Sequence, residues 1–111
     1  MAAFQIIAAP DFERQAKKLN KRYRSWVIGY AELLHSLSQN PVQGSSLGKD
    51  CYKVRLAIAS KNKGKRGGAR IITCVKVVGE RVYLLTVFDK SDRENLAPGE
   101  LDVLLAEAGL G

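Results

Sequence analysis

The sequence predicts an α+β fold, in which two amino-terminal helices pack on a twisted antiparallel sheet of about four strands and a short carboxy-terminal helix follows. In the first third of the chain, apolar residues recur at spacings of three and four, which is typical of amphipathic helices. In the second half, runs rich in Val, Ile, Thr and Tyr favour strands. The chain has 111 residues, of which 46% are hydrophobic, so we expect one core and a single domain over residues 1–111.

A short apolar strand is expected at residues 4–9, and Pro10, which cannot donate a hydrogen bond to a neighbouring strand, closes it. Asp11 then has the position of an N-cap for the first helix. The apolar face that follows consists of Phe12, Ala16, Leu19, Tyr23 and Trp26. The opposite face is cationic and consists of Arg14, Lys17, Lys18, Lys21 and Arg22. This helix is therefore expected to bury one side and to present positive charge on the other.

Ser25 is the expected N-cap of a second helix, which Asn40 and Pro41 stop. The Gly- and Ser-rich residues 41–50 predict a connecting loop. His35, the only histidine, falls on the second helix without acids or thiols nearby, so we expect it to be structural or exposed to solvent.

Three strands are expected at residues 52–59, 69–78 and 81–89. Gly79 and Glu80 predict a tight hairpin, which makes the last two strands antiparallel neighbours. Residues 91–98 are expected to form a loop, and residues 100–108 a short acidic helix. All helices are expected on one side of the sheet.

Cys51 and Cys74 lie in apolar runs without a CxxC pair or a neighbouring histidine, which argues against a zinc site and favours two reduced core residues. No metal and no small-molecule cofactor is expected. The amino terminus lacks the basic start of a signal peptide, and no window has the roughly 20 apolar residues of a membrane span. We therefore expect a soluble, cytoplasmic protein without a membrane partner.

Positive charge is concentrated in the first part of the chain. The net charge is +7, yet residues 1–79 hold fifteen of the 18 Lys and Arg and only four of the 11 Asp and Glu. Such an imbalance indicates a surface that meets a polyanion, with nucleic acid as the leading partner. The alternative is a basic protein that is kept soluble by its surface charge.

Alternation along residues 52–59 places Lys53 and Arg55 on one face of the strand, with Val54 and Leu56 on the other. The apolar face must meet the helices, so the cationic face is expected to be exposed, and Arg70 could join it. Lys90 is expected at its rim. Seven cations occur between positions 53 and 70 without a carboxylate among them: Lys53, Arg55, Lys61, Lys63, Lys65, Arg66 and Arg70.

The composition argues against several hydrolase mechanisms, because the chain has no acidic cluster for two metals, no GxSxG motif and no Walker loop. Cleavage of RNA by its own 2′-hydroxyl remains open, since the protein need only align the hydroxyl, accept a proton and stabilise charge. Crowded lysines become better proton acceptors, and arginine suits phosphate oxygens. From the charge pattern alone, a phosphate-binding surface is the alternative to an enzyme.

The series CYKVRLAI, GKRGGARII and VYLLTVFDKSDRENL resembles the RelE/HigB superfamily of toxins from bacterial type II toxin–antitoxin systems. This resemblance implies a ribosome-dependent endoribonuclease that cuts messenger RNA in the ribosomal A site, with a cognate antitoxin, the ribosome and messenger RNA as partners. The catalytic positions that it implies are Lys53, Arg55, Arg70 and Lys90. The expected RNA or ribosome contacts are Lys61, Lys63, Lys65, Arg66, Lys17, Lys18, Lys21 and Arg22.

Two departures from the family pattern stand out. Many members have a carboxy-terminal tyrosine that stacks on the substrate base, and the segment NLAPGE has none. Ser91 stands where an arginine often follows the lysine. The alternatives on the same fold are a ParE-like gyrase inhibitor and a non-catalytic nucleic-acid-binding relic.

Overall fold

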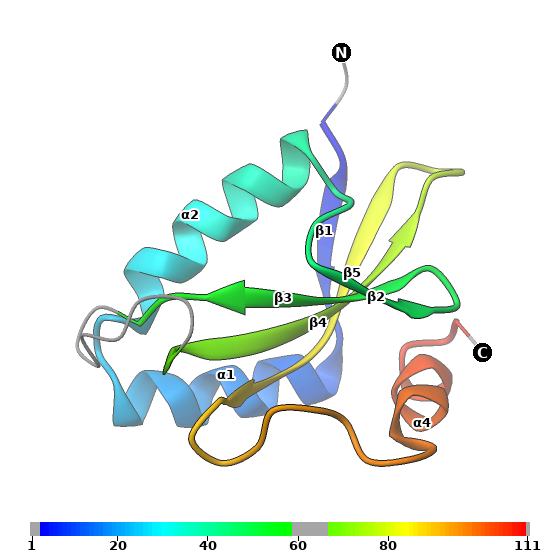
Figure 1. Cartoon of the computed structure of the whole chain (residues 1–111). Coiled ribbons are helices and arrows are strands. Elements are labelled where there is room, and N and C mark those ends of the chain that lie inside the picture. Colours follow the sequence, from blue (N-terminus) through cyan, green and yellow to red (C-terminus); the bar gives the residue numbers. More distant parts are fainter. Residues whose placement is uncertain (1–2, 59–66, 111) are drawn as a thin grey trace.

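The computed structural model describes residues 3–58 and 67–110 and has the predicted α+β class. Its elements are β1 (Gln5–Ala8), α1 (Pro10–Arg22), α2 (Trp26–Gln39), β2 (Ser45–Gly48), β3 (Cys51–Leu56), β4 (Ala69–Lys76), β5 (Arg81–Asp89) and α4 (Glu100–Glu107) (Figure 1). None of the helices in these residues is long and apolar enough to cross a membrane.

The sheet has five strands in the order β1-β5-β4-β3-β2, one more than expected. It is mixed, because β1 pairs with β5 in parallel while the other neighbours are antiparallel. The additional strand is β2, which lies inside the expected loop at residues 41–50. All four of its residues are exposed at the sheet edge, so no buried alternation distinguishes it in the sequence.

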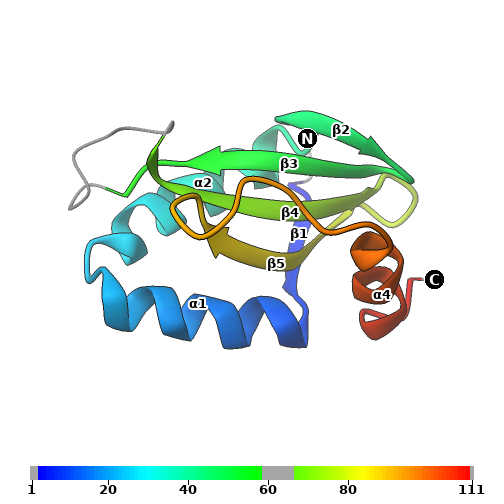
Figure 2. The same ribbon diagram turned by 60° about the horizontal axis from the view of Figure 1, so that its bottom comes forward.

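Helices α1 and α2 cover one face of the sheet (Figure 2). Their Phe12, Leu19 and Leu37 pack with Val54 of β3 and Ile71 of β4. The interleaved residues of the same strands face the other way, as the period of two requires.

Helix α4 packs on the opposite face of the sheet, so the expectation that all helices lie on one side is wrong for this element. Leu104 and Leu105 contact a second apolar cluster there, formed with Cys51, Ile72, Cys74, Leu85 and Phe88. Both faces of the sheet carry apolar residues. Each face is therefore buried by helices, with α1 and α2 on one side and α4 on the other.

The starts of the two long helices differ in detail from the sequence prediction. Helix α1 begins at Pro10 after Ala9, so Asp11 lies in the first turn and is not the N-cap. The fixed φ of proline suits the first helical position, so the helix starts two residues earlier than predicted, with Ala9 and not Asp11 as the N-cap. The Asp11 carboxylate instead accepts a hydrogen bond from Arg14 at 3.0 Å. Ser25 has the predicted N-cap position of α2.

The predicted hairpin between β4 and β5 is confirmed, with Gly79 and Glu80 at positive φ angles of 91° and 53°. The two cysteines are confirmed as buried and free, and they lie directly opposite each other on β3 and β4. Burial, together with the neighbouring Cys74, raises the pKa of Cys51 to about 12. Cys51 therefore stays a neutral thiol at ordinary pH.

Candidate functional site

The face of the sheet opposite α1 and α2 carries the cations of β3 and β4. Lys53 and Arg55 alternate with Val54 and Leu56, and the latter two enter the core beneath the helices, as predicted. The antiparallel register places Arg55 directly opposite Arg70. Three of the four predicted catalytic residues therefore share one face of two neighbouring strands.

Arg70 is not exposed, which corrects the sequence prediction. Its side chain is only 1% exposed, although it belongs to the cationic face. Part of its cover is the segment between β5 and α4, residues 91–99, which we call the strap and whose Glu94 contacts Arg70. The strap runs from the end of β5 in front of β4 to α4 (Figure 2). The sequence left open whether Arg70 joins the face of Lys53 and Arg55, and alternation along a strand cannot show that another segment covers that face.

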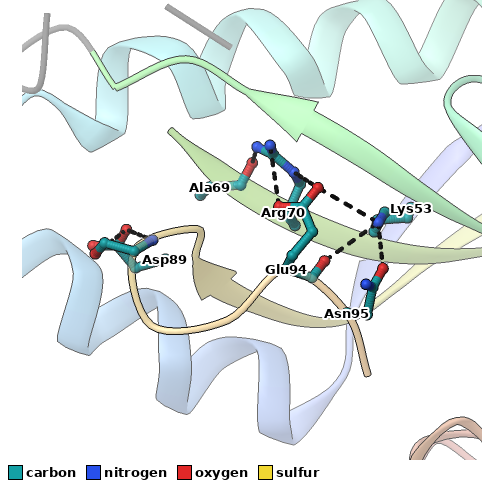
Figure 3. A network of polar contacts seen from close by, with 7 residues as sticks. Lys53, Ala69, Arg70, Asp89, Glu94 and Asn95 are labelled. Carbon is teal, nitrogen blue, oxygen red and sulfur yellow. Dashed lines mark hydrogen bonds and ion pairs between the residues drawn. The ribbon is translucent and has the colours of Figure 1, made fainter. Parts of the chain in front are cut away.

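Glu94 of the strap meets Arg70 (Figure 3). The Arg70 Nη2 atom lies 3.3 Å from Glu94 Oε2, and Nε donates a hydrogen bond to Oε1 at 3.4 Å. The Arg70 Nη1 atom donates to the carbonyl oxygen of Ala69 at 3.1 Å, which fixes the plane of the guanidinium. Both oxygens of the Glu94 carboxylate are therefore turned toward one arginine.

Lys53 joins the same network from the neighbouring strand (Figure 3). Its Nζ atom donates hydrogen bonds to Asn95 Oδ1 at 2.6 Å and to the carbonyl oxygen of Glu94 at 3.3 Å, and it lies 3.7 Å from Glu94 Oε1. The Lys53 side chain is 14% exposed. Lys53 and Arg70 belong to the seven cations between positions 53 and 70, a stretch of sequence without a carboxylate. In the structure, both lie next to the carboxylate of Glu94 in the strap.

The electrostatics of Glu94 follow from this arrangement. Partial desolvation raises its pKa, but the positive charges of Arg70, Lys53 and Lys90 outweigh that effect and hold the pKa below its ordinary value of 4.5. Glu94 is therefore ionised at neutral pH and neutralises part of the cationic face.

Both ends of the strap are held by further polar contacts. At its start, the buried Asp89 accepts hydrogen bonds from the Ser91 backbone and hydroxyl at 2.9 and 2.8 Å, and from the Tyr23 hydroxyl at 2.7 Å. Toward its end, Arg93 binds both oxygens of Glu100 at 2.6 and 2.8 Å. These anchors fix where the strap leaves β5 and where it enters α4.

The other predicted site residues are not all brought together. Arg55 and Lys90 are exposed near the network, and the Lys90 backbone donates to Gly68 at 3.0 Å. Lys61, Lys63, Lys65 and Arg66 lie outside the described residues. Lys17, Lys18 and Lys21 are exposed on α1, on the other side of the sheet. Of the α1 set, Arg22 approaches the strap, at 3.1 Å from Asp92.

Sequence reasoning missed Glu94, Asn95 and Asp89. The one signal in the sequence is the excess of acids from residue 80 onward, which does not indicate which cation each acid meets. Glu94 is 24 positions from Arg70, so no local spacing rule connects the two. Chemically, the site offers an arginine fork, a lysine and a second arginine that can bind phosphate oxygens, with one carboxylate now among them.

The comparisons with known proteins agree with this architecture. The model of the RelE family, described as the RelE toxin of the RelE/RelB toxin–antitoxin system, matches residues 5–110. The free toxin RelE of E. coli, an arginine double mutant, is similar with a TM-score of 0.57 at 18% identity, over 96% of this chain and 95% of that one. The toxin–antitoxin complex RelBE2 of Mycobacterium tuberculosis is similar with a TM-score of 0.54 at 16% identity, over 78% of this chain and 98% of that one. At identities of 16–18%, these two similarities show that the chain has the same fold as the two proteins.

Proposed function

The chain belongs to the RelE toxin family, and from this premise we propose that it is a type II toxin that cuts messenger RNA on the ribosome. The observation that carries the proposal is the placement of Lys53, Arg55 and Arg70 on one sheet face, with Lys90 at its rim. These residue types can bind a phosphate and supply the proton transfers that cleavage of RNA needs.

In the proposed reaction, the 2′-oxygen of the RNA attacks the adjacent phosphorus, and the bond from phosphorus to the 5′-oxygen breaks. A lysine of the pair Lys53 and Lys90 accepts the proton of the 2′-hydroxyl, and the other returns a proton to the departing oxygen. Arg70 and Arg55 stabilise the additional negative charge of the pentacoordinate phosphorus. The nucleophile belongs to the substrate, so the protein contributes alignment, proton transfer and charge.

The ribosome is proposed to hold the messenger in the required conformation, because the described part of the chain has few groups that could organise naked RNA. A cognate antitoxin is the second proposed partner. The complex RelBE2 is by its description a toxin bound to an antitoxin, which supports this assignment. We expect the antitoxin to cover the cationic face with an acidic segment.

The test is cleavage of a translated messenger, measured by mapping new RNA 5′ ends after controlled expression and in a reconstituted translation reaction. The matched pair of variants is Arg55→Ala, on the cationic face, and Arg81→Ala, an exposed arginine at the start of β5. Arg55→Ala is expected to reduce cleavage by roughly 100-fold, and Arg81→Ala is expected to leave it unchanged. Growth arrest with DNA damage signalling and intact messengers would instead indicate gyrase inhibition.

Purified messenger without ribosomes is the second arm of the test. We expect no efficient cleavage of this free RNA, with or without EDTA. Efficient cleavage of free RNA that stops when magnesium is chelated would contradict the proposed mechanism.

A further inference from the structure

The burial of Arg70 conflicts with direct contact to a substrate. A guanidinium whose side chain is 1% exposed cannot bind an RNA phosphate while Glu94 and the rest of the strap lie over it. For Arg70 to act on RNA as the proposed function requires, Glu94 and the strap have to move away from Arg70. The contacts of the strap therefore bear directly on whether the site is accessible.

The Glu94 carboxylate has the chemical character of the group that Arg70 is proposed to bind. A carboxylate and a phosphodiester each present two equivalent oxygens and one negative charge, and the same arginine fork binds either. The two contacts to Arg70, at 3.3 and 3.4 Å, are longer than the roughly 2.7–2.9 Å of an optimal charged hydrogen bond. A ligand with better geometry could therefore replace this carboxylate.

The strap is attached to the sheet in a way that permits local release. Within residues 3–58 and 67–110, each hydrogen bond from residues 94–98 to the strands involves the side chain of Lys53 or Arg70. The apolar contribution from this stretch comes from Leu96, which packs at the edge of the second cluster. Segments with few backbone hydrogen bonds and few buried contacts open at low cost.

We infer that the Glu94 carboxylate occupies the position of an RNA phosphodiester, so that the strap inhibits the site from within the same chain. This inference rests on the proposed function and adds its regulation. Single-stranded RNA has to displace Glu94 from Arg70 and Lys53 before it binds. Release of the strap is then a step that precedes cleavage.

Binding of an uncleavable RNA to the purified full-length protein tests this inference separately from catalysis. The probe is a fluorescent single-stranded RNA of about ten nucleotides with 2′-O-methyl groups, whose affinity is measured by anisotropy at several salt concentrations. Glu94→Gln is expected to bind about tenfold more tightly than wild type. One additional phosphate contact should also steepen the slope of log K against log salt by about 0.7.

Two further variants separate displacement of the strap from a change in net charge. Glu107→Gln removes one negative charge from α4, where Glu107 lies 4.0 Å from the exposed Arg14, and it should leave the affinity within twofold of wild type. Asn95→Ala changes no charge but removes the acceptor of the 2.6 Å hydrogen bond from Lys53, so it should increase the affinity about threefold. Thermal melting confirms that each variant is folded.

The inference is overturned if Glu94→Gln binds no more tightly than wild type, or if Glu107→Gln gives an equal gain. Parallel cleavage assays on translating ribosomes distinguish this failure from failure of the proposed function. Tighter binding by Glu94→Gln without ribosomal cleavage by the wild type would support the inhibited anion site and reject the nuclease. Cleavage by the wild type that is lost in Glu94→Gln would make Glu94 part of the reaction and reject inhibition by the strap.

Discussion

Arg70 of β4 and Glu94 of the strap form an ion pair in which Nη2 lies 3.3 Å from Oε2, and the arginine side chain is 1% exposed while that of the glutamate is 37% exposed. The arginine thus gives up hydration almost completely, whereas its partner remains in contact with water. This asymmetry determines how substitutions at the two positions should differ.

Arg70→Ala is expected to lower the free energy of unfolding by about 2 kcal/mol, because it removes a buried side chain with hydrogen bonds to a charged group. The value is smaller than for a fully buried pair, since Glu94 can regain hydration. Urea denaturation measures the difference. Arg55→Ala, on the same face but exposed, is the control and should change stability by less than about 0.5 kcal/mol. An unchanged midpoint for Arg70→Ala would show that its burial contributes nothing to stability.

Tyr23→Phe is expected to destabilise the protein by about 1.5 kcal/mol, because the buried carboxylate of Asp89 loses the hydrogen bond from the Tyr23 hydroxyl at 2.7 Å. Asp89→Ala should cost more, since it also releases the Ser91 backbone and hydroxyl. Thermal melts of the two variants provide the measurement. If Asp89→Ala were the milder substitution, Asp89 would not be the anchor of the strap.

Gly68→Ala is expected to disrupt the start of β4. A Cβ atom on Gly68 would lie 1.9 Å from the carbonyl oxygen of Leu56, a backbone atom that cannot move without shifting β3. We expect a loss of stability of about 3 kcal/mol or more. Gly79→Ala is the comparison, because its Cβ meets open space and its cost, about 1 kcal/mol, comes from the positive φ alone. Chemical denaturation distinguishes the two, and equal costs would contradict the steric account.

Both cysteine thiols should resist modification in the native protein. Each is fully buried, and burial raises the pKa of Cys51 to about 12, so almost no Cys51 thiolate is present at pH 8. Ellman's reagent should therefore react slowly with native protein and should titrate two thiols after denaturation. Rapid reaction of the native protein would indicate that β3 and β4 separate readily at this position.

Acid should weaken the attachment of the strap. Desolvation raises the pKa of Glu94, but the positive charges of Arg70, Lys53 and Lys90 outweigh it, so the folded pKa lies below 4.5. A group with a lowered pKa stabilises the fold above its unfolded pKa, and this contribution is lost as the pH falls through the folded value. An NMR titration of the Glu94 carboxyl carbon should give a midpoint below 4.5 in wild type. The midpoint should rise in Lys53→Met, and a midpoint at or above 4.5 in wild type would contradict the ion pair.

Local sequence patterns were sufficient for most of the secondary structure. The spacing of Phe12 and Leu19 follows the helical period, and the alternation of Lys53 with Val54 follows the strand period. These periods predict which face of its helix or strand each residue occupies. The hairpin at Gly79 was predictable because a positive φ is a local requirement. Strand β2 was not, since its exposed residues leave no pattern of burial.

The sequence by itself determined that Lys53 and Arg55 share a sheet face, because side-chain direction depends on strand geometry over a few residues. That Arg70 shares this face follows from the register between β3 and β4, which places it opposite Arg55. Only the tertiary structure decided which of them solvent can reach. Glu94 lies 24 positions from Arg70 and meets it through the path of the strap, and burial depends on what packs above a strand from elsewhere in the chain. A carboxylate absent from the cationic stretch of sequence therefore lies against the buried cation Arg70, because folding brings together charges that are far apart in the sequence.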